Sequence, residues 1–441
     1  MKKMTCLLFI LFCLSGYLLA QNETSLKLTA ATRNALIDSI ANALNSYYVF
    51  PDKAKAITGL LKEQLQRGKY DALVSATDFA NKVMADIRAV YNDKHLVIRF
   101  DPGLQQRILS FNTTKKADKA DFEKEQRQNF YFKKLEILPL NTGYIEFTNF
   151  SDTSETARET IRAAMQFVAH TNALILDLRN NYGGNGMMAG EIAGYFFGDS
   201  IYTGRSYNRI ENKWTGQWVK NKPVVTGGLV MKMPIYILTS KRTFSAAEGL
   251  AYTLQQFRKA MVVGDTTRGG AHLTRSFSVG NGFVAFIPIS RSENAITKTD
   301  WEGTGVLPGT RESEENSLIA AQKMILQASL AVVTDENERK KINWQVNYLH
   351  SRTALQAFAK ADLQKFTGQF EEFSFSIEGD QLICSNLHKK DHVDRLLTIS
   401  STMFQVDNEA QVEFVLNDKG ACDVIKLYWN DGWVDTISRT R

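Results

Sequence analysis

The chain has 441 residues, of which 44% are hydrophobic and 23% are charged. This length and composition are those of a globular protein of two or three domains and exclude a disordered chain. The formal net charge is +6 and no long basic block is present, so a nucleic-acid surface is not indicated.

The first 20 residues have the pattern of a secretory signal peptide. A pair of lysines precedes an apolar run over residues 7–19, and polar residues follow Ala20. We therefore expect cleavage after Ala20 and an exported protein, either periplasmic or extracellular. Cys13 could indicate a lipoprotein signal, but Phe12 stands where such a signal needs a small residue, so a lipid anchor is disfavoured. No later stretch is apolar for long enough to span a bilayer.

Removal of that segment leaves two cysteines, Cys384 and Cys422. They could form a disulfide in an oxidising compartment, and the alternative is two buried free thiols in strands. No spacing of cysteine and histidine matches a zinc site, so we expect neither a metal nor a cofactor.

Residues 32–91 have helical periodicity. Apolar residues recur there in three successive segments, which predicts a small helical bundle whose third helix is capped by Thr77. His95 follows that helix and precedes an alternating strand at residues 96–100. A histidine at such a junction is more often a satisfied polar residue than a catalytic base. We assign residues 21–103 to an N-terminal helical module.

Residues 104–134 are polar and charge-rich over most of their length, and we expect an exposed linker or a mobile helix there. A hairpin follows, with strands at residues 135–138 and 144–147.

Three apolar runs, at residues 173–176, 235–238 and 261–263, predict strands, and helices follow the first two. Such strands indicate a largely parallel sheet covered on both faces, an α/β core that we place at residues 135–335. The loops after these strands contain Gly183-Gly184, Ser245 and Gly269-Gly270. Sites in such sheets form at the carboxyl ends of strands, so the loops are expected to converge.

Ser245 lies where the second of these strands gives way to a helix. This position presents a hydroxyl and a backbone amide at a helix N-terminus, where negative charge is stabilised. The simpler interpretation is a helix N-cap. The surrounding residues 243–247 do not form a G-x-S-x-G elbow, and the glycine-rich loops match no phosphate-binding motif, so an ordinary α/β-hydrolase and a nucleotide site are both disfavoured.

The last part of the chain has a different character. Residues 336–362 predict a helical connector, and residues 363–441 predict short alternating strands with turns between them. We expect a separate all-β domain, a small barrel or sandwich, that serves substrate docking or packing.

Four motifs then occur in order, and together they resemble the tail-specific, C-terminal-processing serine peptidases. They are Asp177–Gly184, Thr239–Glu248, Gly264–Ala271 and Trp301–Pro308. The resemblance covers roughly residues 32–326 and leaves the β domain outside it. It implies a ClpP/crotonase-like βαβ core with an N-terminal helical bundle.

Within that family the chain is similar to the branch of tricorn core peptidase and interphotoreceptor retinoid-binding protein. The other branch uses a lysine after Thr-x-Gly, but here Thr267-Arg268-Gly269 is followed by Gly270. The segment between Gly103 and Leu135 is also short for the PDZ domain that the other branch inserts.

Carried over residue by residue, the resemblance implies that Ser245 is the nucleophile, His95 its general base and Glu302 the group that orients the base. It also implies an oxyanion hole made of N–H groups from the Gly183-Gly184 loop and from Ala246.

One departure concerns the residue before the base. Tricorn-like enzymes have a serine there that connects the glutamate to the histidine base, whereas this chain has Lys94. Either Glu302 or Asp93 reaches His95 directly, or the catalytic set is degraded.

The function predicted is that of an exported serine peptidase that cleaves peptides, unfolded proteins or protein C-terminal tails through an acyl-enzyme. The alternative is a weakly active or inactive binding protein for an apolar small ligand on the same scaffold. Its support is the Lys94 departure and an aromatic-rich middle segment that contains Tyr202, Tyr207, Trp214 and Trp218. Such aromatic residues are more often packing groups than a ligand site.

Overall fold

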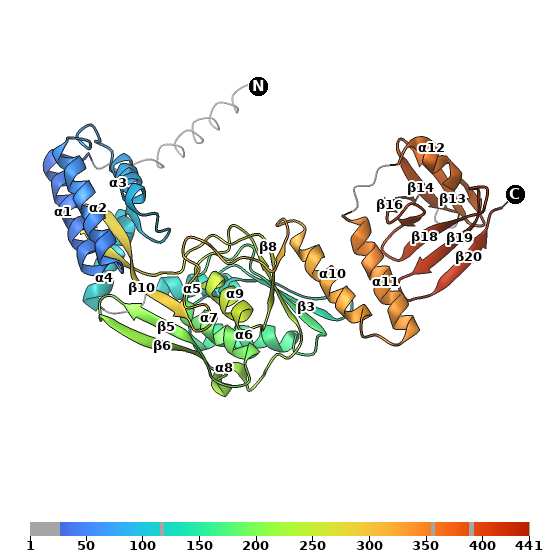
Figure 1. Cartoon of the computed structure of the whole chain (residues 1–441), viewed down its shortest axis with the longest axis horizontal. Coiled ribbons are helices and arrows are strands. Elements are labelled where there is room, and N and C mark those ends of the chain that lie inside the picture. The colour runs from blue at the N-terminus through green and yellow to red at the C-terminus, as the bar shows by residue number, and fades with distance from the viewer. Residues whose placement is uncertain (1–26, 115–118, 354–357, 388–391, 441) are drawn as a thin grey trace, which may run out of the picture. The chain divides into compact units, whose positions relative to one another are not determined.

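The computed structural model describes residues 27–114, 119–353, 358–387 and 392–440 (Figure 1). The predicted signal peptide, residues 1–20, lies outside the described residues. The chain divides into two compact units. The first contains the described residues up to Asp121, Tyr202–Gln217 and Gly270–Gly303, and the second contains Phe122–Ile201, Trp218–Gly269 and the described residues from Thr304 onward.

The first unit begins with the three predicted helices, α1 (Ala30–Tyr47), α2 (Pro51–Gln66) and α3 (Ala76–Val90). The side chain of Ser75 accepts the N–H of Asp78 and so caps α3. The prediction that Thr77 is the cap was therefore wrong, because the helix starts one residue earlier than Thr77 and includes it.

An antiparallel sheet completes this unit. Its long central strand β10 (Phe283–Asn294) pairs with β1 (Val97–Phe100), β9 (Leu273–Gly280) and β5 (Ile201–Asn208), and β6 (Lys213–Val219) lies beyond β5. Leu36, Phe79 and Phe283 belong to one hydrophobic core and are fully buried. The N-terminal helices thus pack on strands that come from much later in the sequence.

The expected linker, residues 104–134, is largely helical. It contains most of α4 (Pro102–Thr114), then α5 (Lys119–Arg127), the short helix η1 (Asn129–Tyr131) and the start of β2. Gln105 on α4 is buried; its Nε2 donates to Ser278 Oγ at 2.8 Å and its Oε1 accepts the Gly282 N–H at 2.8 Å. Of the two alternatives predicted, the helical one agrees with the structure, and the first part of this segment is attached to the sheet rather than exposed.

The second unit is built on a six-stranded sheet of order β11-β8-β7-β4-β3-β2. All neighbouring pairs are parallel except β2–β3, which is the predicted hairpin. The strands are β2 (Phe132–Leu138), β3 (Thr142–Phe147), β4 (Ala173–Asp177), β7 (Ile235–Thr239), β8 (Met261–Gly264) and β11 (Thr310–Arg311).

Helices cover both faces of this sheet, as the continuous apolar strands predict. Ile175 and Leu238 share a core with Ala321 of α10 (Ser317–Leu330) on one face. Their fully buried neighbours Leu174 and Ile237 point to the opposite face. The helices α6 (Glu155–Phe167), α7 (Gly186–Ala193) and α9 (Ala246–Gln256) complete this α/β arrangement, together with the short helices η2 (Gly194–Phe196) and α8 (Pro223–Thr226).

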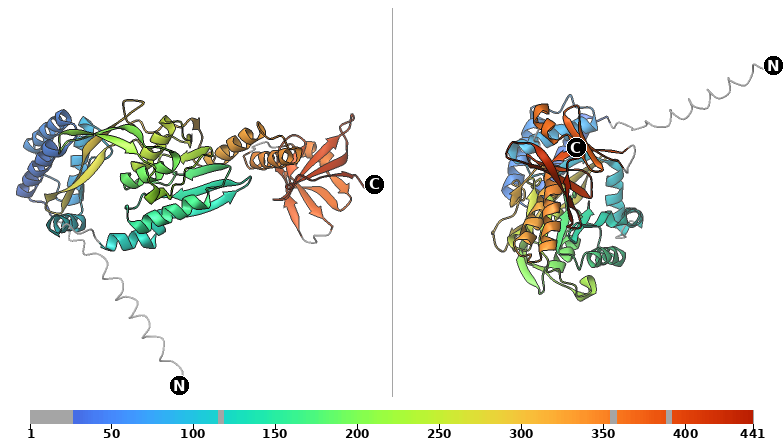
Figure 2. Two further views of the ribbon diagram at one scale, coloured as in Figure 1. Left: turned by 90° about the horizontal axis from the view of Figure 1, so that it is seen from below. Right: turned by 90° about the vertical axis from the view of Figure 1, so that its right-hand side faces the viewer.

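The C-terminal residues form two antiparallel sheets, after α11 (Glu336–Ser351), α12 (Lys360–Leu363) and η3 (Gln364–Phe366) (Figure 2, orange and red strands). One sheet contains β12 (Gly368–Phe370), β13 (Phe373–Glu378), β14 (Gln381–Asn386) and β15 (Val393–Arg395). The other contains β16 (Leu397–Thr398), β17 (Met403–Gln405), β18 (Ala410–Leu416), β19 (Cys422–Trp429) and β20 (Val434–Ser438). The two sheets share one aromatic core, as in a sandwich.

Cys384 and Cys422 lie in this core as free, buried thiols, one in each sheet. Burial raises the pKa of the Cys384 thiol to about 12, so it stays protonated at neutral pH.

Among the described residues, none of the helices combines the length and the apolar character that a membrane crossing requires.

Replacement of Phe414 by alanine tests the core of the β domain. The Phe414 ring contacts those of Phe366, Phe375 and Phe404, with the nearest centroid at 4.7 Å. We expect Phe414→Ala to lower the free energy of unfolding of this domain by about 3–5 kcal/mol, because it leaves a cavity. Urea denaturation followed by tryptophan fluorescence measures the change. Val415→Ala is the control, since Val415 lies on the other face of β18 and is 37% exposed; equal losses for both variants would contradict the shared core.

Candidate active site

Ser245 immediately precedes α9 and has an unusual backbone conformation. Its φ is 54° and its ψ is −118°, whereas an N-cap residue normally lies in the extended region. A positive φ is strained for a residue other than glycine and persists only where the surroundings impose it. Ser245 takes part in a capping box with Glu248, but its backbone differs from that of an ordinary N-cap. Its geometry has the sharp strand-to-helix turn of a nucleophile elbow, although the local sequence does not.

The loop after β4 lies directly against this serine. A side chain at Gly183 would come within 2.8 Å of both the Ser245 Cβ and the Phe244 carbonyl oxygen. The Phe244 N–H also donates to the Asn181 carbonyl at 3.0 Å. Glycine is thus required at position 183 for the loop after β4 to reach the loop after β7.

The amides expected to form an oxyanion hole do not all have the same surroundings. The Gly183 N–H donates to Oδ1 of Asn181 at 2.9 Å, so this group is already engaged and does not fit the predicted role. In the part of the chain that the structure describes, the N–H groups of Gly184 and Ala246 donate to no protein group. Gly184 has a φ of 123°, a conformation for which glycine is suited.

A buried carboxylate holds the serine loop in place. Glu248, fully buried at the third position of α9, accepts the Ser245 N–H with Oε2 at 2.8 Å. Its Oε1 accepts the Thr267 hydroxyl at 2.5 Å and the Gly269 N–H at 2.6 Å. Thr267 Oγ1 in turn accepts the Val306 N–H at 2.7 Å. The predicted convergence of the loops after β7 and β8 is therefore confirmed, and Glu248 is the residue that joins them.

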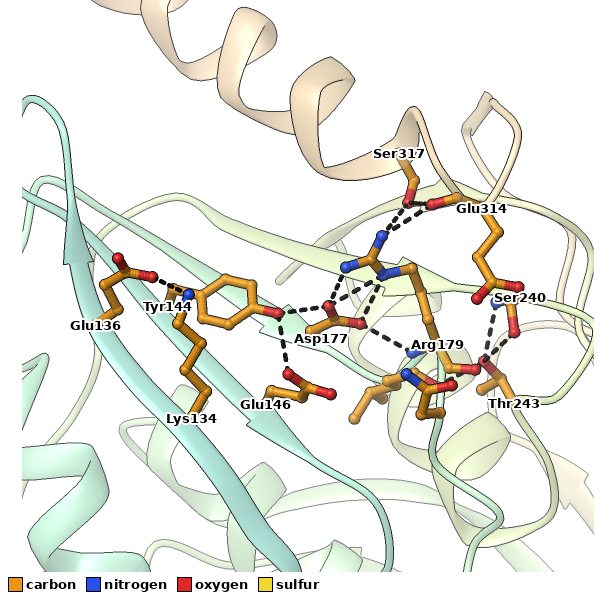
Figure 3. Close-up of polar contacts among 12 residues, drawn as sticks. Lys134, Glu136, Tyr144, Glu146, Asp177, Arg179, Ser240, Thr243, Glu314 and Ser317 are labelled. Carbon is orange, nitrogen blue, oxygen red and sulfur yellow. Dashed lines mark hydrogen bonds and ion pairs between the residues drawn. The ribbon is translucent and has the colours of Figure 1, made fainter. Parts of the chain in front are cut away.

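A second polar network ties the loop after β4 to the loop after β7 (Figure 3). Asp177 is buried at the end of β4, accepts the Tyr144 hydroxyl at 2.6 Å and forms an ion pair with Arg179. The Arg179 carbonyl accepts the Ser240 hydroxyl at 2.6 Å, and the Leu178 carbonyl accepts the Thr243 hydroxyl at 2.7 Å. The first and second sequence motifs are thus joined side by side.

The first unit contains the other predicted residues, His95 and Glu302, in a cluster of ionisable groups. Glu302 Oε2 lies 4.0 Å from His95 Nδ1, too far for a hydrogen bond, and 3.4 Å from Nδ1 of His272. Asp93 contacts the His272 ring at 2.9 Å, and its contact with His95 is to the backbone N–H, also at 2.9 Å. The structure therefore brings Glu302 near His95. A direct hydrogen bond between the His95 ring and Glu302 or Asp93 was one of the alternatives expected from the sequence, and neither carboxylate makes one.

The charges in this cluster shift the pKa values of its members. Burial lowers the pKa of His272, but its hydrogen bond to Asp93 and the negative charges of Asp93 and Glu302 outweigh burial, so the pKa is raised above 6.5. Burial raises the pKa of Asp93, but the His272 hydrogen bond and charge outweigh it and the pKa lies below 3.8. The contacts with Asp93 and Glu302 therefore favour the imidazolium form of His272, which lies between two carboxylates.

The same three residues have the spacing of a metal site, because ligand atoms of Asp93, His272 and Glu302 lie within 4.8 Å of one another. These atoms already have protein partners. Asp93 Oδ2 accepts the Tyr48 hydroxyl at 3.0 Å, and Glu302 Oε2 accepts the Ala271 N–H at 2.6 Å. We interpret the group as a hydrogen-bonded ion network.

Sequence reasoning missed two residues of these networks. Glu248 could have been found, since Ser-x-x-Glu before a helix is the capping-box pattern. His272 follows the third motif directly, but its role depends on a contact with Asp93, 179 residues earlier.

Two family descriptions match the chain. Residues 141–311 match Peptidase family S41, and residues 18–130 match the N-terminal domain of Peptidase S41 in eukaryotic IRBP. The chain belongs to peptidase family S41. The resemblance found in the sequence is thereby confirmed, and the two matches flank the start of the hairpin β2–β3.

Sequence relatives within the S41 family are carboxyl-terminal-processing enzymes. The chain is 28% identical over 170 residues to carboxyl-terminal-processing peptidase 2, chloroplastic, of Arabidopsis thaliana, which covers 38% of this chain and 31% of that protein. It is 28% identical over 169 residues to a carboxyl-terminal-processing protease of Picosynechococcus, which covers 38% of each. The chain thus spans roughly a third of the length of the curated relatives it matches.

Solved structures of low identity also match. A lipoprotein of Streptococcus agalactiae aligns at 18% identity and a TM-score of 0.47 over 67% of this S41 chain and 96% of that chain. The photosystem II D1 C-terminal processing protease aligns at 11% identity and a TM-score of 0.40 over 65% of this chain and 94% of that chain.

Glu248→Gln tests whether the buried carboxylate holds the loops together. The amide offers only one acceptor oxygen and places an NH₂ group against an N–H or O–H donor. We expect a loss of about 3 kcal/mol in the free energy of unfolding, measured by urea denaturation, because hydrogen bonds to charged groups are the strong ones. Glu159→Gln, at an exposed position of α6, is the matched control and should change stability by less than about 0.5 kcal/mol. A Glu248→Gln variant as stable as this control would contradict the assignment.

Proposed function

We propose that this S41 chain is a serine peptidase in which Ser245 is the nucleophile, His95 the general base and Glu302 the group that orients the base. The observation that carries the proposal is the strained backbone of Ser245 at the start of α9. The amides of Gly184 and Ala246, which donate to no protein group among the described residues, support it because they are donors in the two loops that meet at this serine.

The proposed chemistry is acyl transfer. Ser245 Oγ attacks the scissile carbonyl while His95 takes its proton, and the oxyanion that forms accepts hydrogen bonds from Gly184 and Ala246. His95 then protonates the leaving amine, and water hydrolyses the acyl-enzyme by the reverse proton path. Gly183 is left out of the donor set, since its N–H already serves Asn181. Its role is to allow the close approach of the two loops.

Ser245 belongs to the second compact unit, and His95 and Glu302 belong to the first. The proposal therefore requires that the active enzyme bring these groups together. A reaction that depends on both Ser245 and His95 is the test of this requirement.

The proposed substrates are peptides, unfolded proteins or protein C-terminal tails. The support is the naming of the relatives as carboxyl-terminal-processing enzymes, over the roughly one third of their length that this chain matches. We also propose that the enzyme is exported, either periplasmic or extracellular, on the basis of the signal-peptide pattern of residues 1–20.

The ligand-binding alternative loses part of its support in the structure. Trp214 lies 5.5 Å from the Tyr207 ring, and the guanidinium groups of Arg205 and Arg291 lie 4.2 and 5.1 Å from the Trp214 ring. The aromatic rings of Tyr207 in β5 and Trp214 in β6 thus contact each other, and the Trp214 ring also contacts two arginine side chains.

Reaction with a fluorophosphonate probe tests the serine and the base together. We expect the purified protein to be labelled at Ser245, because an activated hydroxyl attacks phosphorus as it attacks a carbonyl. Ser245→Ala should abolish labelling, and His95→Ala should slow it by about 10²–10⁴-fold, the usual contribution of a general base. Mass spectrometry of the labelled peptide measures both effects.

Ser110→Ala, at an exposed serine of α4, is the matched control and should label like the wild type. A folded wild-type protein that does not react, or one that reacts equally well without His95, would contradict the proposed peptidase. The ligand-binding alternative would then be favoured.

A further inference from the structure

His272 occupies the centre of the ion network in the first unit, and the peptidase mechanism above gives it no role. We propose that His272 is a positioning residue that, as an imidazolium, bridges Asp93 and Glu302 and so holds the Glu302 carboxylate toward the His95 ring. This inference rests on the proposed function in that it assumes His95 to be the base.

The first half of the argument is the contact between His272 and Asp93. His272 is 3% exposed, and its Nδ1 lies 2.9 Å from Asp93 Oδ2. Asp93 is fixed in turn by the Tyr48 hydroxyl at 3.0 Å and by the backbone N–H of His95 at 2.9 Å. The Phe50 ring packs edge-on against His272, with centroids 5.3 Å apart. The imidazole is therefore held both by hydrogen bonds and by packing, and Asp93 connects it to the main chain of the proposed base.

The second half is the position of Glu302. Its side chain is 10% exposed, and Oε2 accepts the Ala271 N–H at 2.6 Å while lying 3.4 Å from His272 Nδ1 and 4.0 Å from His95 Nδ1. Glu302 thus faces both imidazoles with the same oxygen. His272 thus adds a cationic partner to a carboxylate that accepts the Ala271 amide.

Among the titratable groups around His272, acidic side chains outnumber cationic ones. Asp93, Glu302 and Asp300 all bring negative charge, and Tyr48 and Tyr91, at the ends of α1 and α3, are neutral because burial and these carboxylates raise their pKa values. The positive groups are His95, when protonated, and Arg291 of β10, whose charge acts on Asp300. His272 is therefore the cation in direct contact with both Asp93 and Glu302 among the described residues.

The consequence for catalysis follows from charge. Without the imidazolium, Asp93 and Glu302 would face each other with no cation in contact with both. Glu302 would then no longer be held toward the imidazolium that His95 becomes during proton transfer. Because the pKa of His272 is raised, the bridge is present below pH 6.5 and is lost as the pH rises through the raised value. The reaction rate should therefore fall at alkaline pH.

A double-mutant cycle on the labelling rate tests the bridge. His272→Gln retains a hydrogen-bond donor without the charge, and Glu302→Gln retains the shape of the orienting group. We expect each single variant to slow fluorophosphonate labelling by about tenfold or more at pH 7.5, as part of what a general base contributes. The double variant should be no slower than the slower single one, because both changes remove the same interaction. His272→Gln should also lose the alkaline fall in rate.

Two results would overturn the bridge. One is a double variant slowed by the product of the two single effects, and the other is an unchanged pH profile in His272→Gln. Phe50→Leu is the matched control for packing: it removes the ring that contacts His272 but leaves the charges, so it should keep the alkaline fall even if it lowers the melting temperature.

An NMR titration separates this inference from the peptidase proposal and does not need His272→Gln to fold. The ¹⁵N shifts of the His272 ring, assigned through its contact with the Phe50 ring, give its pKa in the wild type and in Glu302→Gln. A lower pKa in Glu302→Gln supports the bridge even in a protein that the probe does not label. An unchanged pKa shows that Glu302 and His272 are not coupled and refutes it.

Discussion

The Glu248 carboxylate is the interaction on which the arrangement around Ser245 depends. Burying a carboxylate is unfavourable unless donors replace the water it loses, and Glu248 has three donors from two loops. The Ser245 N–H comes from the start of α9, and the Thr267 hydroxyl and Gly269 N–H come from the loop after β8. Because all three must be present for the burial to be tolerated, the two loops are held together as one piece.

The two compact units solve the problem of a buried carboxylate in different ways. Glu248 accepts hydrogen bonds from neutral N–H and O–H donors. Glu302 has one N–H donor, from Ala271, and lies beside His272. A network of neutral donors does not change with pH near neutrality, whereas a network built on an imidazolium does. The serine side of the proposed site is thus fixed, and the base side is sensitive to pH.

The parts of the fold that were predicted correctly from the sequence depend on local pattern. Helical periodicity gave α1 to α3, and uninterrupted apolar runs gave the parallel strands β4, β7 and β8. The errors depend on single hydrogen bonds or on distant partners. Ser75 rather than Thr77 caps α3 because the helix starts at Ala76, two residues earlier than a cap at Thr77 implies. The helix α4 is held to the sheet through Gln105 and Ser278, 173 residues apart.

In the candidate site, too, features that follow from local sequence pattern were predicted, and those that depend on single hydrogen bonds or distant partners were not. Ser245 could be located from the junction of a strand and a helix, and Gly183 from its place in a glycine-rich loop. That the Gly183 N–H serves Asn181 could not be predicted, because it depends on how the loop turns within two residues. His272 was missed for a different reason, since a lone histidine acquires a role only when the fold brings Asp93 and Glu302 to it.

The backbone of Ser245 bears on the choice between a cap and a nucleophile. A serine that served only as an N-cap would take the extended conformation, which carries no strain. Ser245 instead adopts φ 54° and ψ −118°, a conformation that costs on the order of 1–3 kcal/mol. The Glu248 hydrogen bond to its amide and the absence of a side chain at Gly183 make that conformation possible. Capping α9 does not require this cost, whereas turning the serine at the junction of β7 and α9 toward a substrate does, and for that reason the strain favours the nucleophile.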